Sequence, residues 1–277
     1  MISLIVLLGL VLYLLVGGRQ TKSDCMCTEG FECPCASWSD YKSVQQPLAK
    51  KRGAISEGFT AAAAAATAAP TKKTEGPYPP LKVLVINLDA RHDRWKRVSS
   101  MLDEFGVDYE RFPAIKASPG WLGCGLSHSA AAEEAKRRRY MWVLVLEDDC
   151  VITKENWRRF EELLPWLWKN RAEWNLFNGG LTYANNVEVL DKKKALLRSN
   201  GFAMHFILYQ PAVYDTIRRW NRAEPVDVYV DKKIKAIAPY PLIATQEKGE
   251  SDIVGSHTEY DDLIDKTNGT FRVVLGL

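Results

Sequence analysis

Two continuous apolar segments, each followed by polar side chains, constrain the fold of this chain more than any other feature. Lys82–Asn87 (KVLVIN) and Met141–Leu146 (MWVLVL) are rich in aliphatic and β-branched residues, as are strands buried on both faces. Segments with helical spacing follow or separate them, among them Asp93–Phe105 and Ser127–Tyr140. An alternation of buried strands and helices predicts an α/β domain.

The remainder of the domain continues this alternation. We expect further strands at Tyr109–Phe112, Asn175–Asn178 and Phe202–Tyr209, and further helices at Asn156–Lys169 and Pro211–Trp220. The predicted fold class is therefore α/β, with a mixed, mostly parallel sheet flanked by helices. Ligands of such sheets bind beyond the carboxyl ends of the strands. The polar residues that follow the two apolar segments should thus lie on one rim.

The first 80 residues differ from this pattern. Met1–Gly18 carries no charged side chain and is about as long as a helix that crosses a bilayer. No basic residue precedes it, and aliphatic residues run directly into Gly17, so we expect an uncleaved single-pass anchor rather than a signal peptide. Residues 19–80 are predicted to be a cysteine-containing stalk and flexible linker, with an alanine run and several prolines. The folded domain should cover residues 81–277.

The stalk and the flanking charges leave two questions open. Its cysteines, Cys25, Cys27, Cys33 and Cys35, fit local disulfides, palmitoylation or zinc binding. Arg19 and Lys22 after the anchor favour a cytoplasmic domain. The sequon Asn268-Gly269-Thr270 would matter only in a secretory lumen. The side of the membrane on which the domain lies is therefore not predicted.

Composition excludes several classes of function. The net charge is only +3, from 37 basic and 34 acidic residues, whereas domains that bind nucleic acid usually show a stronger basic excess. We expect no nucleic-acid partner. The chain contains no G-x-S-x-G, P-loop, HExxH or GxGxxG motif, so the common hydrolase, NTPase, zincin and dehydrogenase signatures are absent.

The acidic triplet Glu147-Asp148-Asp149, directly after the second apolar segment, is the strongest chemical signal. Adjacent carboxylates beside a buried strand repel one another and lose hydration. Mg²⁺ or Mn²⁺ would offset both costs, because these ions prefer carboxylate oxygens and often bind one or two carboxylates together with a substrate diphosphate. We expect a metal at Asp148 and Asp149; the alternative is a solvated acidic turn.

The segment Asn87–Trp95 (NLDARHDRW) follows the first apolar strand. A junction between a strand and a helix presents free backbone N–H groups to an anion. Arg91 and Arg94 add charged groups for a phosphate, and Asn87 could contact a nucleobase or ribose. The alternative is a simple helix cap by Asp93.

A third cluster, Gly123–His128 (GCGLSH), precedes a predicted helix. Its glycines allow another backbone to approach closely. Ser127 could cap the helix, which would place His128 in the first turn, facing the candidate site. The alternative for His128 is a structural hydrogen bond.

Together these clusters resemble glycosyltransferase family 25, the lipopolysaccharide and procollagen galactosyltransferases. The family motifs NLDxRxDRW, GCxLSH and an apolar strand followed by EDD occur here in order, at Asn87–Trp95, Gly123–His128 and Met141–Asp149. A fourth match comprises Pro225-Val226-Asp227, Pro241-Leu242, Gln246 and Ser251-Asp252. The resemblance covers roughly Leu81–Val254. The short catalytic domain is also similar to family members from large DNA viruses.

The resemblance implies a GT-A fold and the metal-dependent, inverting transfer of a sugar, galactose or glucose, from a UDP-linked donor to a hydroxyl of a glycan or protein acceptor. It implies that Asp149 holds Mn²⁺ or Mg²⁺, with Asp148 assisting or binding the ribose. Asp227 would be the general base, with Asp252 as the second candidate. The implied donor-binding residues are Asn87, Arg91, Arg94, Ser127, His128 and Asp148. His205 is a further candidate contact, although Phe202–Tyr209 departs from the family pattern.

Two other functions compete with this prediction. One is a catalytically inactive, membrane-anchored relative that acts as a binding or assembly protein; the intact acidic triplet and Asp227 argue against it. The other is a metal-dependent phosphoesterase, which usually needs a second His/Asp cluster to hold two metals. The four histidines, His92, His128, His205 and His257, are scattered along the chain.

Overall fold

The computed structural model describes residues 77–251, 257–258 and 260–277. The predicted anchor, the stalk and linker up to residue 76, and the candidate base Asp252 lie outside the described residues. Among the helices that the model describes, none combines the length and hydropathy needed to cross a bilayer.

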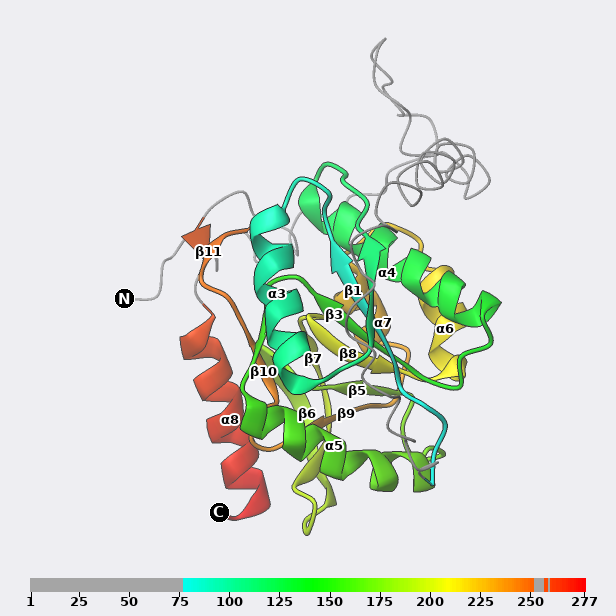
Figure 1. Ribbon diagram of the computed structural model, residues 1–277. Coiled ribbons are helices and arrows are strands. Elements are labelled where there is room, and N and C mark those ends of the chain that lie inside the picture. The colour runs from blue at the N-terminus through cyan, green and yellow to red at the C-terminus, as the bar shows by residue number, and fades with distance from the viewer. Residues whose placement is uncertain (1–76, 252–256, 259) are drawn as a thin grey trace, which may run out of the picture. The chain divides into compact units, whose positions relative to one another are not determined.

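Eight of the described strands form one mixed sheet in the order β2-β1-β3-β8-β5-β9-β7-β6 (Figure 1). The strands are β1 (Lys82–Asn87), β2 (Tyr109–Pro113), β3 (Val143–Glu147), β5 (Leu176–Asn178), β6 (Tyr183–Asp191), β7 (Leu196–Phe202), β8 (Phe206–Tyr209) and β9 (Ala236–Pro239). Strand β1 pairs in parallel with β2 and β3, and β5 pairs in parallel with β9. The other four pairings are antiparallel. The mixed α/β class is confirmed, with more antiparallel pairing than expected.

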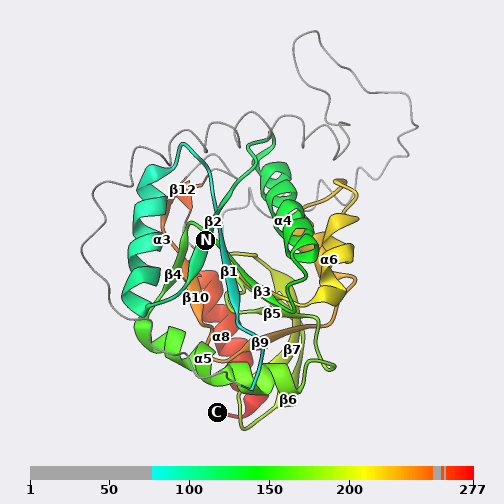
Figure 2. The same ribbon diagram turned by 45° about the vertical axis from the view of Figure 1, so that its right-hand side comes forward.

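Strands β1 and β3 lie at the centre of two apolar layers, as their continuous apolar sequences predict. On one face, Val83 and Val85 pack with residues of α3 (His92–Phe105) and α5 (Lys154–Lys169). On the other face, Leu84 and Ile86 pack with residues of α4 (Gly120–Arg137) and α6 (Pro211–Arg218). Figure 2 shows these helix pairs on opposite sides of the sheet. Burial of each such aliphatic side chain stabilises the fold by about 1.5–3 kcal/mol. Because both strands are held in place by this packing, the positions of their carboxyl ends at the rim are fixed as well.

Helix α4 begins seven residues before the predicted start at Ser127, so the GCGLSH segment lies inside the helix. Ser127 is therefore not the N-cap; its hydroxyl donates to the Gly123 carbonyl and accepts from the Ile115 N–H, both at 2.8 Å. The glycines allow close packing, since a Cβ at Gly123 would lie 2.6 Å from the Ile115 oxygen and one at Gly125 would overlap the Trp220 ring. Packing thus outweighs the cost of about 1 kcal/mol for each glycine in a helix.

The predicted strand Phe202–Tyr209 is divided in two. Strand β7 ends at Phe202 and β8 begins at Phe206, and between them Ala203 adopts a φ of +85°, which interrupts the strand geometry. The long antiparallel hairpin of β6 and β7 was not predicted. Its strand β6 packs against α8 (Asp261–Leu275), which also carries the sequon; there the Asn268 side-chain oxygen accepts the Leu242 N–H.

The remaining elements are short. They are β4 (Cys150–Ile152), which pairs with β10 (Ala244–Gln246), then β11 (Gly249–Glu250), which pairs with β12 (His257–Thr258), and helix α7 (Val226–Asp231). Strand β4 follows β3 after a two-residue turn at Asp148 and Asp149, so the acidic triplet ends one strand and immediately leads into another.

Candidate active site

A pocket with about 140 Å³ of enclosed space opens beyond the carboxyl ends of β1 and β3. Six polar residues from the three sequence motifs line it: Arg94, Ser127, His128, Glu147, Asp148 and Asp149. The segment between β2 and α4, including Lys116, forms another wall, and Gln246 and Tyr260 lie on the opposite side. The structure thus brings the arginine motif, the α4 motif and the acidic triplet together at one rim, where parallel strands of an α/β sheet place ligands.

The Asp148 carboxylate accepts hydrogen bonds from two residues of the arginine motif, Asn87 and Arg94. Its Oδ2 accepts a 2.6 Å hydrogen bond from the Asn87 amide, and its Oδ1 accepts a 3.1 Å bond from the Arg94 guanidinium. Burial raises the pKa of Asp148, while the bonds from Asn87 and Arg94 oppose that shift. Asp148 therefore holds Arg94 toward the pocket while both of its own oxygens accept protein hydrogen bonds.

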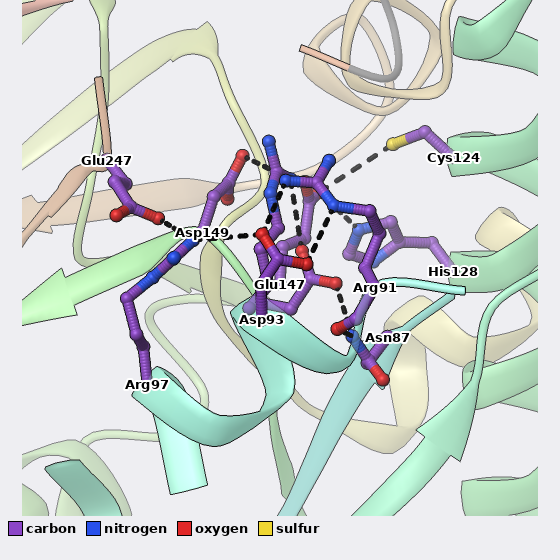
Figure 3. Close-up of polar contacts among 11 residues, drawn as sticks. Asn87, Arg91, Asp93, Arg97, Cys124, His128, Glu147, Asp149 and Glu247 are labelled. Atoms are coloured by element: carbon purple, nitrogen blue, oxygen red, sulfur yellow. Dashed lines mark hydrogen bonds and ion pairs between the residues drawn. The ribbon is translucent and has the colours of Figure 1, made fainter. Parts of the chain in front are cut away.

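Asn87 and Arg91 do not line the pocket. Asn87 is buried; its amide nitrogen also donates to the Arg91 carbonyl, and its oxygen accepts a 2.8 Å bond from Arg111. The Arg91 guanidinium pairs with Asp93 at 3.1 Å (Figure 3). Asn87 and Arg91 thus support the junction between β1 and α3, whereas Arg94 lines the pocket.

Asp149 differs from Asp148 in having a free acceptor. Its Oδ2 lies 3.5 Å from Arg94, but its buried Oδ1 has no hydrogen-bond partner among the described residues. Burial, followed by the charge of Glu147, raises the pKa of Asp149 to about 7. An unsatisfied buried carboxylate oxygen is costly in a native protein unless a ligand or ion completes it. Asp149 therefore fits the expected cation ligand best.

Glu147, the first residue of the triplet, belongs to a separate buried network. Its Oε1 lies 2.8 Å from His128 Nε2, and His128 Nδ1 lies 2.8 Å from the Tyr209 hydroxyl. The Cys124 thiol lies 3.6 Å from the same Glu147 oxygen (Figure 3). Burial alone would raise the pKa of Glu147, but the hydrogen bond and charge of His128 outweigh it, so the pKa is lowered.

Asp227 lies on the other side of the site, in the first turn of α7. Its two oxygens accept backbone N–H groups of Ala203, at 3.3 Å, and Val228, at 2.9 Å. It lines a second, smaller cavity together with Asn178 and Gly201 rather than the main pocket. Burial is the main cause of its raised pKa, which makes the ionised carboxylate a stronger base.

His205, the further candidate contact, lines neither cavity. It is fully buried, and its ring fills the space where a Cβ at Gly180 would lie. Burial lowers the pKa of His205 to about 4, so the ring is neutral at pH 7. The structure therefore places His205 inside the fold, away from both cavities, and an acceptor contact by His205 stays an untested prediction.

Sequence reasoning missed several residues of the site. Cys124 lies within a motif that was recognised, but it was not given a role. Lys116 could have been found, because it follows β2, the parallel neighbour of β1, and so belongs to the same rim. Tyr260, which lines the pocket, and Tyr209, which contacts His128 from the core, come from segments without a motif, so no sequence signal identifies them.

The chain matches no protein-family model, and no curated protein matches it. Among solved structures, it is similar to a glycosyltransferase involved in the glycosylation of the major capsid of PBCV-1, with 9% identity over 68% of this chain and 100% of that chain and a TM-score of 0.42. It is also similar to mannose-1-phosphate geranyltransferase from Thermus thermophilus, with 10% identity over 57% of this chain and 73% of that chain and a TM-score of 0.30. Scores this low assign neither fold nor function.

Proposed function

We propose that the protein is a metal-dependent, inverting glycosyltransferase of the GT-A type, which transfers galactose or glucose from a UDP-linked donor to a hydroxyl of a glycan or protein acceptor. The observation that carries this proposal is Asp149, which lines the pocket together with Arg94 and whose buried Oδ1 has no hydrogen-bond partner among the described residues. The family resemblance of the three motifs that meet there supports the choice of reaction.

The donor set of the pocket fits a hard divalent cation. Asp149 would hold Mn²⁺ or Mg²⁺ through its free oxygen, with Asp148 assisting, because both ions prefer carboxylate ligands. When bound, the ion supplies positive charge that stabilises the departing nucleoside diphosphate. Arg94 and Lys116 line the same pocket and would add positive charge for the phosphates.

Asp227 is proposed as the general base. In an inverting displacement, the acceptor oxygen attacks the anomeric carbon, the bond from that carbon to the phosphate oxygen breaks, and the base takes the hydroxyl proton. The raised pKa of Asp227 suits that role, and Asp227 and Glu147 lie within electrostatic range of each other. Asp252 stays the second candidate.

An aromatic pair beside Asp227 supports a carbohydrate acceptor. Tyr183 and Phe202 are cross-strand partners whose rings stack at a centroid distance of 5.5 Å and an interplanar angle of 15°. The Tyr183 side chain is half-exposed, and the residue after Phe202 bonds to Asp227. Exposed aromatic rings provide flat apolar area, and Tyr adds a polar end, which suits a sugar ring.

The test is release of UDP from UDP-galactose and UDP-glucose by the full chain in detergent, with Mn²⁺ or with EDTA. The proposal predicts metal-dependent release that increases when simple methyl glycosides are added. Metal-dependent binding of UDP without release under any condition would instead favour the inactive relative. A second assay, alkaline extraction of membranes, tests the proposed anchor: deletion of residues 2–18 should move the protein to the supernatant.

A further inference from the structure

We propose that Cys124, His128 and Glu147 form a binding site for Zn²⁺, separate from the expected hard-cation site at Asp148 and Asp149. The two sites share a pocket but no ligand. This inference does not depend on the proposed transferase activity, since it rests on the ligand chemistry of three side chains; a metal at His128 would replace the donor contact that the family resemblance implies for that residue.

The three donor atoms converge on one point. Cys124 Sγ, His128 Nε2 and a Glu147 carboxylate oxygen all lie within 4.8 Å of one another. Cys124 and His128 are four residues apart on α4 and so project from one face of the helix, while Glu147 approaches from the end of β3. This is the arrangement of a site built from one helix and one strand.

The separations are close to those of a zinc site. Bonds of about 2.0–2.3 Å in a tetrahedron place neighbouring ligand atoms about 3.3–3.8 Å apart. The separation of 3.6 Å between Cys124 Sγ and Glu147 Oε1 already falls in this range. The separation of 2.8 Å between His128 Nε2 and Glu147 Oε1 needs to widen by about half an ångström, a small side-chain adjustment.

Tyr209 supports the site as the outer hydrogen-bond partner of His128. Its hydroxyl lies 2.8 Å from His128 Nδ1, and Tyr209 is fully buried, so it fixes the plane of the imidazole. With the proton on Nδ1, directed at Tyr209, Nε2 is free to bind a metal. Histidine ligands in metal sites nearly always have such an outer partner. Coordination releases one proton, from the Cys124 thiol, to solvent.

The surroundings favour a cation here. Burial is the main cause of the raised pKa of the Cys124 thiol, and the negative charges of Glu147, Asp227 and Asp149 raise that pKa further, so the thiol stays protonated until a cation binds. The nearby guanidinium of Arg94 is directed at Asp148 and Asp149 instead. A divalent ion at Cys124 would offset this accumulated negative charge.

The ligand types select the metal. Thiolate and imidazole are poor ligands for Mg²⁺ and Mn²⁺ but good ligands for Zn²⁺ and Co²⁺. All three residues line the main pocket, through which an ion and a fourth, non-protein ligand would enter. Three protein ligands with one open position is the pattern of non-structural zinc sites. In the absence of metal the hydrogen bonds satisfy the same groups, so folding does not require zinc.

The experiment is a Co²⁺ titration of the full chain in detergent, with Cys25, Cys27, Cys33 and Cys35 changed to Ser so that no stalk thiol contributes. Absorption from thiolate-to-cobalt charge transfer reports the bond to sulfur, and Zn²⁺ displacement gives its affinity. With excess Mn²⁺ present to occupy the carboxylate site, we expect one Co²⁺ per chain to give the charge-transfer absorption and to be displaced by Zn²⁺. Cys124→Ser should abolish the absorption, and Cys150→Ala, which removes a buried thiol outside the cluster, should leave it unchanged.

A second variant distinguishes a loss of metal binding from a loss of folding. Tyr209→Phe keeps the ring but removes the outer hydrogen bond, and should weaken Zn²⁺ binding about 10- to 100-fold while the Co²⁺ absorption keeps its shape. The inference is overturned if the background protein binds no Co²⁺, or if folded Cys124→Ser retains the charge-transfer absorption. Neither result depends on sugar transfer, so failure here leaves the proposed function untouched.

Discussion

The two sides of the candidate site are built differently. On the donor side, two strands buried on both faces end at Asn87 and the acidic triplet, and side chains far apart in sequence hold each other through the bonds of Asp148 to Asn87 and Arg94. On the acceptor side, Asp227 lies on a six-residue helix and accepts backbone N–H groups. The proposed donor side is thus fixed by specific side-chain pairs, whereas Asp227 on the proposed acceptor side is fixed by backbone N–H groups.

The half-exposed Tyr183 stacks on Phe202, whose neighbour Ala203 bonds to Asp227, so this aromatic pair belongs to the proposed acceptor side. The predictions below separate the two sides by asking which variants lose donor binding and which lose only transfer.

The largest expected effect is on the donor side. Asp149→Ala removes the carboxylate proposed to hold the metal, and we expect loss of metal-dependent UDP binding and a fall in kcat/KM of roughly 10³-fold or more. UDP binding by calorimetry and UDP release measure both effects. Asp215→Asn, which changes an exposed carboxylate paired with Lys136, is the control. Unchanged turnover in the Asp149 variant would refute the metal assignment.

On the acceptor side, Asp227→Asn should keep donor affinity near that of the wild type while kcat falls about 10²- to 10⁴-fold, because a general base is lost. The matched control is Asp231→Asn, since Asp231 lies one turn further along α7 and also accepts a backbone N–H, from Gly201. If Asp227→Asn instead weakens UDP binding, the division between the two sides is wrong.

The packing that positions α4 can be tested without any ligand. Gly125→Ala forces a methyl group against the Trp220 ring, and we expect a loss of about 1–3 kcal/mol in the free energy of unfolding. Gly269→Ala, in α8, meets no atom within 4 Å and should stabilise the protein by up to about 1 kcal/mol. Urea unfolding compares them; equal stability of the two variants would contradict the close approach at Gly125.

A smaller effect is expected at the aromatic pair. Tyr183→Ala should raise KM for a glycoside acceptor about 2- to 10-fold and leave UDP affinity unchanged, because a stacked ring contributes about 0.5–1.5 kcal/mol. Val189→Ala removes an exposed apolar side chain from the same strand and should change neither value. An equal rise in KM for both variants would argue against the aromatic site.

The last prediction concerns the pH dependence of stability. The folded pKa of Asp149, about 7, lies above the ordinary value of 3.8, so the folded state binds more protons than the unfolded state between these values. The contribution of Asp149 to stability is therefore present below about pH 4 and is lost as pH rises toward 7. The Tm in EDTA should fall less over this range in Asp149→Asn than in the wild type. Parallel Tm curves for the two proteins would contradict the raised pKa.

The sequence predicts the two central strands and the rim at their ends well, because these signals are local. KVLVIN predicts a strand buried on both faces, and the residues after it and after Leu146 are expected on one rim. The donor-binding roles of these residues stay predictions. The metal expected at the triplet stays a prediction. In the structure the three carboxylates of the triplet have different partners. Glu147 bonds to His128 and Asp148 bonds to Arg94, whereas Asp149 Oδ1 has no hydrogen-bond partner among the described residues.

The sequence predicts the acceptor side poorly for physical reasons. Strand β6 is partly exposed, and β6 and β7 both contain polar residues. Neither strand therefore forms a continuous apolar segment that would predict it from the sequence. The predicted start of helix α4 lies too far along the chain, because Gly123 and Gly125 disfavour a helix. The structure shows that these glycines allow close packing against Ile115 and Trp220. Those partners come from other parts of the chain, and a single sequence does not reveal them.

The most direct test of the central claim is a thermal-shift panel on the full chain with UDP, GDP, CMP and their common sugar conjugates, each in Mn²⁺ or EDTA. A ligand that binds only the native state raises its Tm by mass action. We predict a rise with UDP or a UDP-sugar that disappears in EDTA and in Asp149→Ala. A folded sample that shows no shift with any nucleotide would contradict the account and favour a binding or assembly role.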